Sequence, residues 1–320
     1  MPFPVLMMTN RSNSGGGLGD DIAAMRYFEL TGQDPNVLAS WSSLTKAAFV
    51  KRLQGIADGF YRVPEDKNED QQHLSVFVHG YNVSWTDACQ RFIQVKDDLF
   101  EKTGLGCLIL FSWPSMGSVA GYLPDREEAR QCANAFAAEL VSLHTIISKT
   151  QATAAANQDP NLLCKAKVSI LAHSMGNYVT QKALAMAAKQ LNSPQLVTLI
   201  TQVAMVAADV DNDLFQKDKA LDSDGSLMAN LCYRIGALYT GLDQVLGASA
   251  GLKHFGTRRL GRSGLADRSN VWDNVFDQDV SAYLDLSKPI HSAVFDSPKA
   301  MKLLEAVLRG VDRSHLPDSV

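Results

Sequence analysis

One serine carries the strongest signal for chemistry in this sequence. Ser174 lies in Ala172-His-Ser-Met-Gly176, between an apolar run and a helical pattern, with a small residue two positions before and two positions after it. This matches the nucleophile-elbow pattern G-x-S-x-G, with alanine for the first glycine, in which a sharp turn lifts the serine hydroxyl out of a sheet. We expect Ser174 to be a nucleophile and the Met175 backbone N–H to stabilise an oxyanion; the alternative is a serine that only caps the next helix.

A serine nucleophile needs a base. The hydroxyl is weak at neutral pH, and a histidine held by a carboxylate usually accepts its proton, in the chain order serine, acid, histidine. His254, His291 and His315 follow Ser174. His254 precedes the last predicted strand and His315 lies in a polar tail, whereas His291 lies between that strand and the closing helix. We therefore expect His291 to be the base.

The acid has two candidates. Asp243 comes just after the apolar run 232–239, and Asp209 comes just after the preceding run, 199–207. The order of elements favours Asp243 and leaves Asp209 as the alternative acid. Asp209, Asp211 and Asp213 also alternate as calcium ligands can, but the glycine and the distal glutamate of an EF-hand loop are missing, so we expect no metal site.

A second oxyanion donor is expected from the turn after an earlier strand. His79-Gly-Tyr-Asn82 follows such a strand, and its glycine would let the backbone N–H of Tyr81 face the reacting carbonyl. A plain turn between strand and helix is the alternative, and both readings can hold together.

Regular elements must position these residues. Continuous apolar runs are typical of buried parallel strands, and they occur at 74–79, 107–111, 167–172, 199–207 and 232–239, with weaker strands near the N-terminus and at 271–277. Helical spacing of apolar residues occurs at 86–101, 126–148, 175–190 and 298–309. Strands that alternate with helices predict an α/β fold with a mostly parallel, doubly wound sheet flanked by helices.

The remaining segments are expected to be connections. We expect 12–19 to be a flexible loop and 151–161 a loose connection, while 215–230 and 246–268 could form small lids over a cleft. We expect one domain over 1–320, with an N-terminal strand and extension at 1–73 and a core at 74–310.

Composition sets wider limits. The chain has 320 residues, a net charge of −4 and a pI near 6.0, which give no electrostatic reason to expect nucleic acid as a partner. The five cysteines are scattered without a C-x-x-C pair, so we expect no disulfide framework. No apolar run is long enough to span a bilayer, and the N-terminus is a poor signal peptide, so we expect a cytoplasmic protein. The chemistry expected of Ser174 requires no cofactor.

Several segments together resemble an uncharacterised bacterial family of α/β-hydrolases, formally a domain of unknown function. They run in order from about Leu74 to His291 and include Val76-Phe-Val-His-Gly-Tyr-Asn82, Phe111-Ser-Trp-Pro-Ser115, Gly121-Tyr-Leu-Pro-Asp-Arg126 and Ala172-His-Ser-Met-Gly-Asn177. The resemblance implies a serine hydrolase-like fold with Ser174, Asp243 and His291 in the triad positions. Around the acid the family usually has Y-x-S-x-x-D followed by R-A-L, and Gly241 and Gln244-Val-Leu246 depart from it here.

The function expected from these residues is cleavage of a carboxylic ester or related acyl bond in a small-molecule or lipid-like substrate. The alternative is a non-catalytic hydrolase-like module that binds a partner through a cleft ringed by Tyr81, Trp85, Trp113 and Tyr122. A nucleotide-binding protein is disfavoured, because Gly15-Gly-Gly-Leu-Gly19 lacks the Gly-Lys-Ser/Thr of a Walker loop and the third glycine of a Rossmann fingerprint. Neither the substrate nor the oligomeric state follows from the residues.

Overall fold

The computed structural model describes residues 3–115, 122–191, 198–253 and 257–316. It contains one nine-stranded sheet in the order β3-β2-β1-β5-β4-β6-β7-β8-β9. In this spatial order, each neighbouring pair in the series β1-β5-β4-β6-β7-β8-β9 is parallel, while β2 runs antiparallel to β1 and to β3. The strands are β1 (Leu6–Ser14), β2 (Gly17–Leu30), β3 (Trp41–Leu44), β4 (His73–Val78), β5 (Gly106–Ser112), β6 (Lys167–His173), β7 (Ile200–Val206), β8 (Cys232–Tyr239) and β9 (Val275–Asp279).

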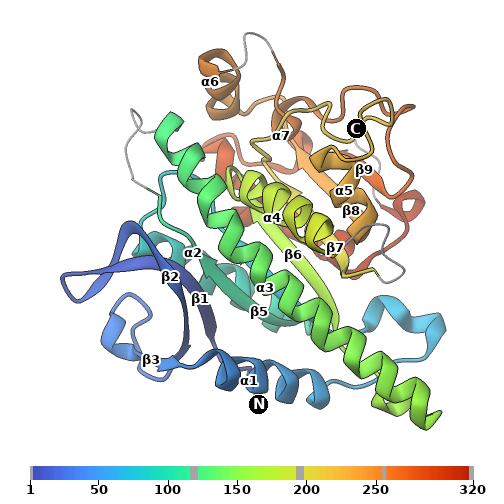
Figure 1. The fold of residues 1–320 in the computed structure, drawn as a ribbon. Helices are drawn as coiled ribbons and strands as arrows, with labels where there is room; N and C mark the ends of the chain where they lie inside the picture. The colour runs from blue at the N-terminus through green and yellow to red at the C-terminus, as the bar shows by residue number, and fades with distance from the viewer. Residues whose placement is uncertain (1–2, 116–121, 192–197, 254–256, 317–320) are drawn as a thin grey trace.

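Helices cover both faces of this sheet. The α-helices are α1 (Lys46–Gly59), α2 (Trp85–Val95), α3 (Tyr122–Asn157), α4 (Gly176–Gln190), α5 (Asp224–Leu231), α6 (Gln244–Lys253), α7 (Leu260–Ser263) and α8 (Pro298–Arg309). Side chains of α1, α3, α4 and α5 pack against one face, and those of α2 and α8 pack against the other. The expected α/β-hydrolase fold, with its mostly parallel sheet between helices, is therefore confirmed (Figure 1).

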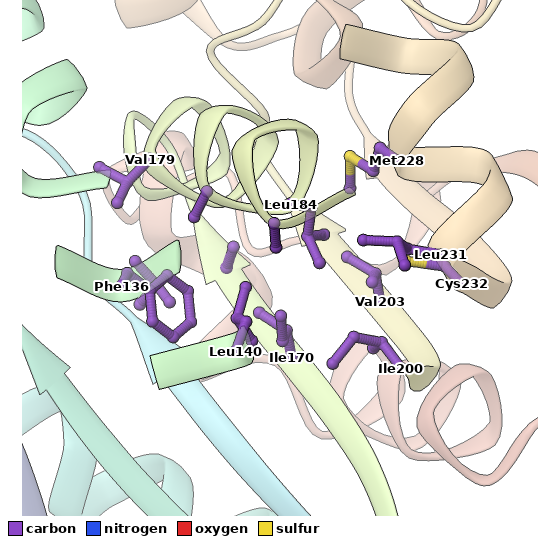
Figure 2. Close-up of a cluster of buried hydrophobic side chains, with 14 of the residues drawn as sticks. Phe136, Leu140, Ile170, Val179, Leu184, Ile200, Val203, Met228, Leu231 and Cys232 are labelled. Atoms are coloured by element: carbon purple, nitrogen blue, oxygen red, sulfur yellow. The ribbon is translucent and has the colours of Figure 1, made fainter. Parts of the chain in front are cut away.

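Alternation along the strands divides the core into two clusters. In a strand, successive side chains point to opposite faces. Ile170 of β6 accordingly packs under α3 and α4, whereas Leu171 joins the cluster under α2 and α8. Figure 2 shows the first cluster, in which Phe136 and Leu140 of α3 meet Ile170, and Leu184 of α4 lies near Met228 of α5. Both faces of the central strands are buried, which is why their sequences are continuously apolar.

The N-terminal prediction was incomplete. The segment 12–19, expected as a loop, forms the end of a hairpin in which Ser14 pairs with Gly17. Gly15 and Gly16 have φ of +51° and +88°, which permits the two-residue turn that matches the twist of the strands. The extension within 1–73 therefore contributes three strands to the same sheet as the core, since β1 pairs with β5.

Two further boundaries differ from expectation. The segment 151–161 was expected to be a loose connection, but α3 continues through it as far as Asn157. Alanine has the highest helix propensity, so the Ala-rich run favours continuation of the helix. The last strand lies at Val275–Asp279 rather than at 271–277. Within the described ranges, every helix is too short or too polar to cross a membrane.

Candidate active site

Ser174 lies in a tight turn between β6 and α4. Its φ is +53°, a left-handed conformation that is uncommon for residues other than glycine. A Cβ at Gly176 would lie 2.4 Å from the carbonyl oxygen of His79, so only glycine lets the start of α4 approach the end of β4 this closely. The local sequence therefore produces a strained turn at Ser174, which is 5% exposed.

Asn177 holds this turn from beneath. Its fully buried side-chain amide lies 3.1 Å from the carbonyl oxygens of Ala172 and Ser174, and 3.2 Å from that of Val206. Sequence reasoning gave this residue no role, although it ends the motif that contains Ser174. A buried amide that bonds the backbone on both sides of a strained residue stabilises the turn.

The structure brings Ser174, His291 and Asp243 together. His291 Nε2 lies 2.8 Å from Ser174 Oγ, and His291 Nδ1 lies 2.7 Å from Asp243 Oδ2. A carboxylate can only accept, so Nδ1 carries the proton and Nε2 is free to accept from the serine hydroxyl. Ser174 follows β6, Asp243 follows β8, and His291 lies between β9 and α8, so three carboxyl-end loops meet at one edge of the sheet.

Asp243 is buried and charged. Burial by itself would raise the pKa of its carboxyl group. The hydrogen bond from His291, electrostatic attraction to that residue and the Leu246 N–H together lower the pKa below its usual value. The Leu246 N–H donates to Asp243 Oδ1 over 3.0 Å. One carboxylate oxygen thus accepts from the backbone of α6 and the other accepts from His291. These bonds keep the carboxylate ionised and fix its orientation.

Asp209, the alternative acid, has other partners. It is 2 % exposed and forms an ion pair with Arg259, whose Nε lies 3.1 Å away, and it accepts from Ser249 Oγ over 2.7 Å. Asp211 also pairs with Arg259, and Asp213 pairs with Lys219. Two of the three alternating aspartates thus share Arg259, and the third pairs with Lys219. Of the described residues, no three His, Cys, Asp or Glu side chains form a group that could hold a metal ion.

The two proposed oxyanion donors come from different segments of the chain. Met175 is the N-cap of α4, and its backbone N–H donates to no other described residue. Tyr81 follows β4 in the turn 79–82. Gly80 of this turn lies close to the serine, because a Cβ there would be 3.3 Å from Ser174 Oγ.

The loop after β5 fixes the turn that carries Tyr81. His79 Nδ1 donates to the carbonyl oxygen of Gly80 over 2.9 Å, while His79 Nε2 accepts from the Trp113 N–H over 3.2 Å. The Asn82 N–H donates to Ser115 Oγ over 2.8 Å. Burial lowers the pKa of His79 to about 3, so the ring stays neutral and keeps both bonds near neutral pH. The two segments that the sequence singled out separately therefore act as one support.

His173, next to Ser174, supports the loop that carries His291. Its Nε2 donates to the backbone carbonyl oxygen of His291 over 2.9 Å, and its ring packs against Phe295. Burial, followed by the nearby His291, lowers the pKa of His173 to about 3. The neutral ring therefore ties the loop that carries His291 to the end of β6. Sequence reasoning named His173 only as part of the serine motif.

The other expected residues take different places. Trp113 is fully buried and Trp85 is 5 % exposed, so both belong to the core instead of ringing a cleft. Among the other histidines, His315 is exposed after α8. His254, Gly121 and the side chain of Tyr122 lie outside the described residues. In the possible lid 215–230, α5 packs into the core, as Met228 and Leu231 do in Figure 2.

A cavity of about 300 Å³ lies beside this site. Gly80, His173 and Ser292 line the wall nearest to the serine and its base, and α2 contributes the polar residues Gln90, Arg91 and Gln94. The cavity thus borders the chain neighbours of Ser174 and His291, while these two side chains do not themselves line it.

Comparison with known proteins identifies relatives of unknown activity. An uncharacterized protein, alr1448, of Nostoc sp. (strain PCC 7120 / SAG 25.82 / UTEX 2576) is 27% identical over 175 residues, which are 48% of this chain and 39% of that protein. This chain therefore spans well under half of that relative's length.

Among solved structures, a lipase and an esterase align with this chain at low similarity. Aspergillus fumigatus lipase B matches with a TM-score of 0.34 and 11% identity, over 97% of this chain and 65% of that one. A hyperthermophilic esterase from the archaeon Pyrobaculum calidifontis matches with a TM-score of 0.38 and 10% identity, over 75% of this chain and 77% of that one. The model of a family described as "Alpha/beta hydrolase of unknown function (DUF900)" matches residues 62–307. The chain belongs to this family of α/β-hydrolases.

Proposed function

We propose that this protein is a serine hydrolase that cleaves a carboxylic ester or a related acyl bond. One observation carries the proposal: Ser174 Oγ lies 2.8 Å from His291 Nε2, and His291 Nδ1 lies 2.7 Å from Asp243. Hydrogen bonds in this order make a hydroxyl nucleophilic at neutral pH. The ionised, buried Asp243 and the strained φ of Ser174 support the same assignment.

The mechanism that follows is acyl transfer through a covalent intermediate. His291 Nε2 accepts the Ser174 proton as Oγ attacks the carbonyl carbon, and Asp243 stabilises the imidazolium that forms. The backbone N–H groups of Met175 and Tyr81 donate to the oxyanion of the tetrahedral intermediate. His291 then returns the proton to the leaving alcohol, which departs, and water repeats the sequence to release the carboxylic acid and free serine. In this proposal the cavity lined by Gly80 and Ser292 would accommodate one side of the scissile bond.

A phosphonylation experiment tests this proposal directly. A fluorophosphonate probe reacts with an activated serine, and intact-protein mass reports the number of adducts. We expect one adduct on the parent protein, no adduct on Ser174→Ala, and strongly slowed labelling of His291→Ala. Ser42→Ala is the matched control, because Ser42 lies exposed on the edge strand β3 and should leave the adduct unchanged.

The same experiment separates the second candidate function. A folded parent protein that gains no adduct would contradict the serine hydrolase and favour a hydrolase-like binding module. An adduct that persists in Ser174→Ala would place the reactive group elsewhere.

A further inference from the structure

A second cavity lies far from Ser174. It has a volume of about 440 Å³ and lies between α1, α3 and the sheet. Its floor includes Leu74 of β4 and Val168 of β6, which lie near the amino ends of their strands. Ser174 follows the carboxyl end of β6, six residues beyond Val168, which at ~3.3 Å per residue is roughly 20 Å away. The cavity is therefore separate from the candidate active site.

The shape of this cavity suits one extended chain. Its walls run from Phe49 to Asp58 on α1 and from Phe136 to Thr150 on α3. At 1.5 Å per residue these helix segments span roughly 14 to 21 Å. Dividing 440 Å³ by a length of roughly 17 Å gives a mean cross-section of about 26 Å², which suits one hydrocarbon chain.

The lining is apolar along most of this length. Side chains such as Leu53 of α1 and Leu143 and Ile147 of α3 pack against the core, line the cavity and are only partly buried. Protein interiors are normally close-packed, and an apolar cavity of this kind favours an apolar ligand over water. A polar substrate or cofactor would find few partners on these walls.

Charged residues lie at both ends of the cavity: Glu139 at one, and Lys165 with Asp58 at the other. At one end Glu139 is already paired, since it accepts from Tyr27 and from Lys46 over 2.7 Å and 3.0 Å. At the other end Lys165 donates to the carbonyl oxygen of Asp58 over 3.0 Å, which uses one of its three N–H donors. Leu162 is 42% exposed at this end. A cation beside an apolar entrance suits a chain that ends in a carboxylate.

We propose that this cavity binds a single long-chain fatty acid, with its alkyl chain between α1 and α3 and its carboxylate at Lys165. This site is independent of the proposed serine hydrolase, because none of its residues contacts Ser174, His291 or Asp243. Ser174→Ala protein should accordingly bind the fatty acid as tightly as the parent does.

The test measures binding of palmitate to the full chain. Palmitate, kept below its critical micelle concentration, is titrated against protein loaded with cis-parinaric acid, and displacement is followed by fluorescence. We expect palmitate to bind the parent saturably. Leu143→Trp and Ile147→Phe fill the cavity and should lose this binding, while their melting temperatures should match that of the parent. Leu221→Trp is the control, since Leu221 is 77% exposed away from the cavity, and it should bind as the parent does.

The carboxylate end is tested by a second pair of ligands. Lys165→Gln should weaken palmitate binding about fivefold, the effect of losing a partly exposed ion pair, and should leave hexadecanol binding unchanged. Equal weakening of both ligands would overturn the placement of the carboxylate. The site itself would be overturned if palmitate did not bind saturably, or if the parent and the filled variants bound it equally. It would also be overturned if the protein bound phospholipid vesicles but not free palmitate.

Discussion

Exchanging the two candidate acids for asparagine should have opposite consequences. Asp243→Asn removes the charge that faces His291 and replaces the acceptor at 2.7 Å by a group that can donate. The imidazole then loses the tautomer in which Nε2 can accept from Ser174. Asp209→Asn leaves that arrangement intact and instead removes a carboxylate from the fully buried Arg259.

The expected magnitudes follow from these contacts. Asp243→Asn should lower the rate of phosphonylation, or of ester turnover once a substrate is found, by about 10⁴. Asp209→Asn should destabilise the fold by about 3 kcal/mol, because Arg259 keeps Asp211 but loses its buried partner. For a chain of this length, that loss lowers the melting temperature by about 4 °C, given an unfolding entropy near 2.1 cal/mol/K per residue. Its labelling rate should change by no more than about threefold.

Two assays on the same samples decide the question. Labelling by fluorophosphonate is timed by intact-protein mass, and unfolding is followed by differential scanning calorimetry. Asp273→Asn is the control, because its side chain is 95% exposed, and both readouts should match the parent. If Asp209→Asn stopped labelling while Asp243→Asn labelled normally, the assignment of the acid would be wrong.

Three further predictions address the supports of the site. Gly176→Ala should destabilise the fold by about 3 kcal/mol and slow labelling, since its Cβ would lie 2.4 Å from a backbone oxygen. Gly55→Ala, which has open space around it in the exposed part of α1, should stabilise the fold by about 1 kcal/mol. Urea unfolding compares the two variants, and a Gly176→Ala protein as stable as the parent would refute the close approach. His173→Phe should slow labelling about tenfold, because it removes the hydrogen bond to the carbonyl of His291. His173→Gln can still donate this bond and should keep most of the parent's labelling rate. Equal rates in the two variants would contradict a positioning role for His173. Burial lowers the pKa of His73, His79 and His173 to about 3, so below about pH 6.5 the unfolded chain binds more protons than the folded one, and the free energy of unfolding should fall by up to about 1.4 kcal/mol per pH unit for each histidine. Urea titrations at pH 7 and pH 5 on the parent and on a glutamine variant of one of these histidines measure this effect. A stability that does not change with pH would contradict it.

The sequence determined the framework of this protein through local patterns. Apolar runs at 167–172 and 232–239 predicted β6 and β8 almost to the residue, since a strand buried on both faces must be continuously apolar. The small residues around Ser174 predicted its turn, because a nearby backbone leaves no space for larger ones. The hairpin at 12–19 and the end of α3 were missed, because glycine-rich and alanine-rich runs are each compatible with a loop or a regular element.

The partners of each polar group depended on the tertiary structure. Asp209 and Asp243 both follow a strand, and local sequence does not show that one faces Arg259 and the other His291. The same limit applied to the bonds of His173 and Asn177. It also applied to the cavity between α1 and α3, whose nearest helix ends are 63 residues apart along the chain. Strand and helix patterns arise from neighbours along the chain, whereas charge pairing and cavity shape arise from residues that meet only after the sheet has formed.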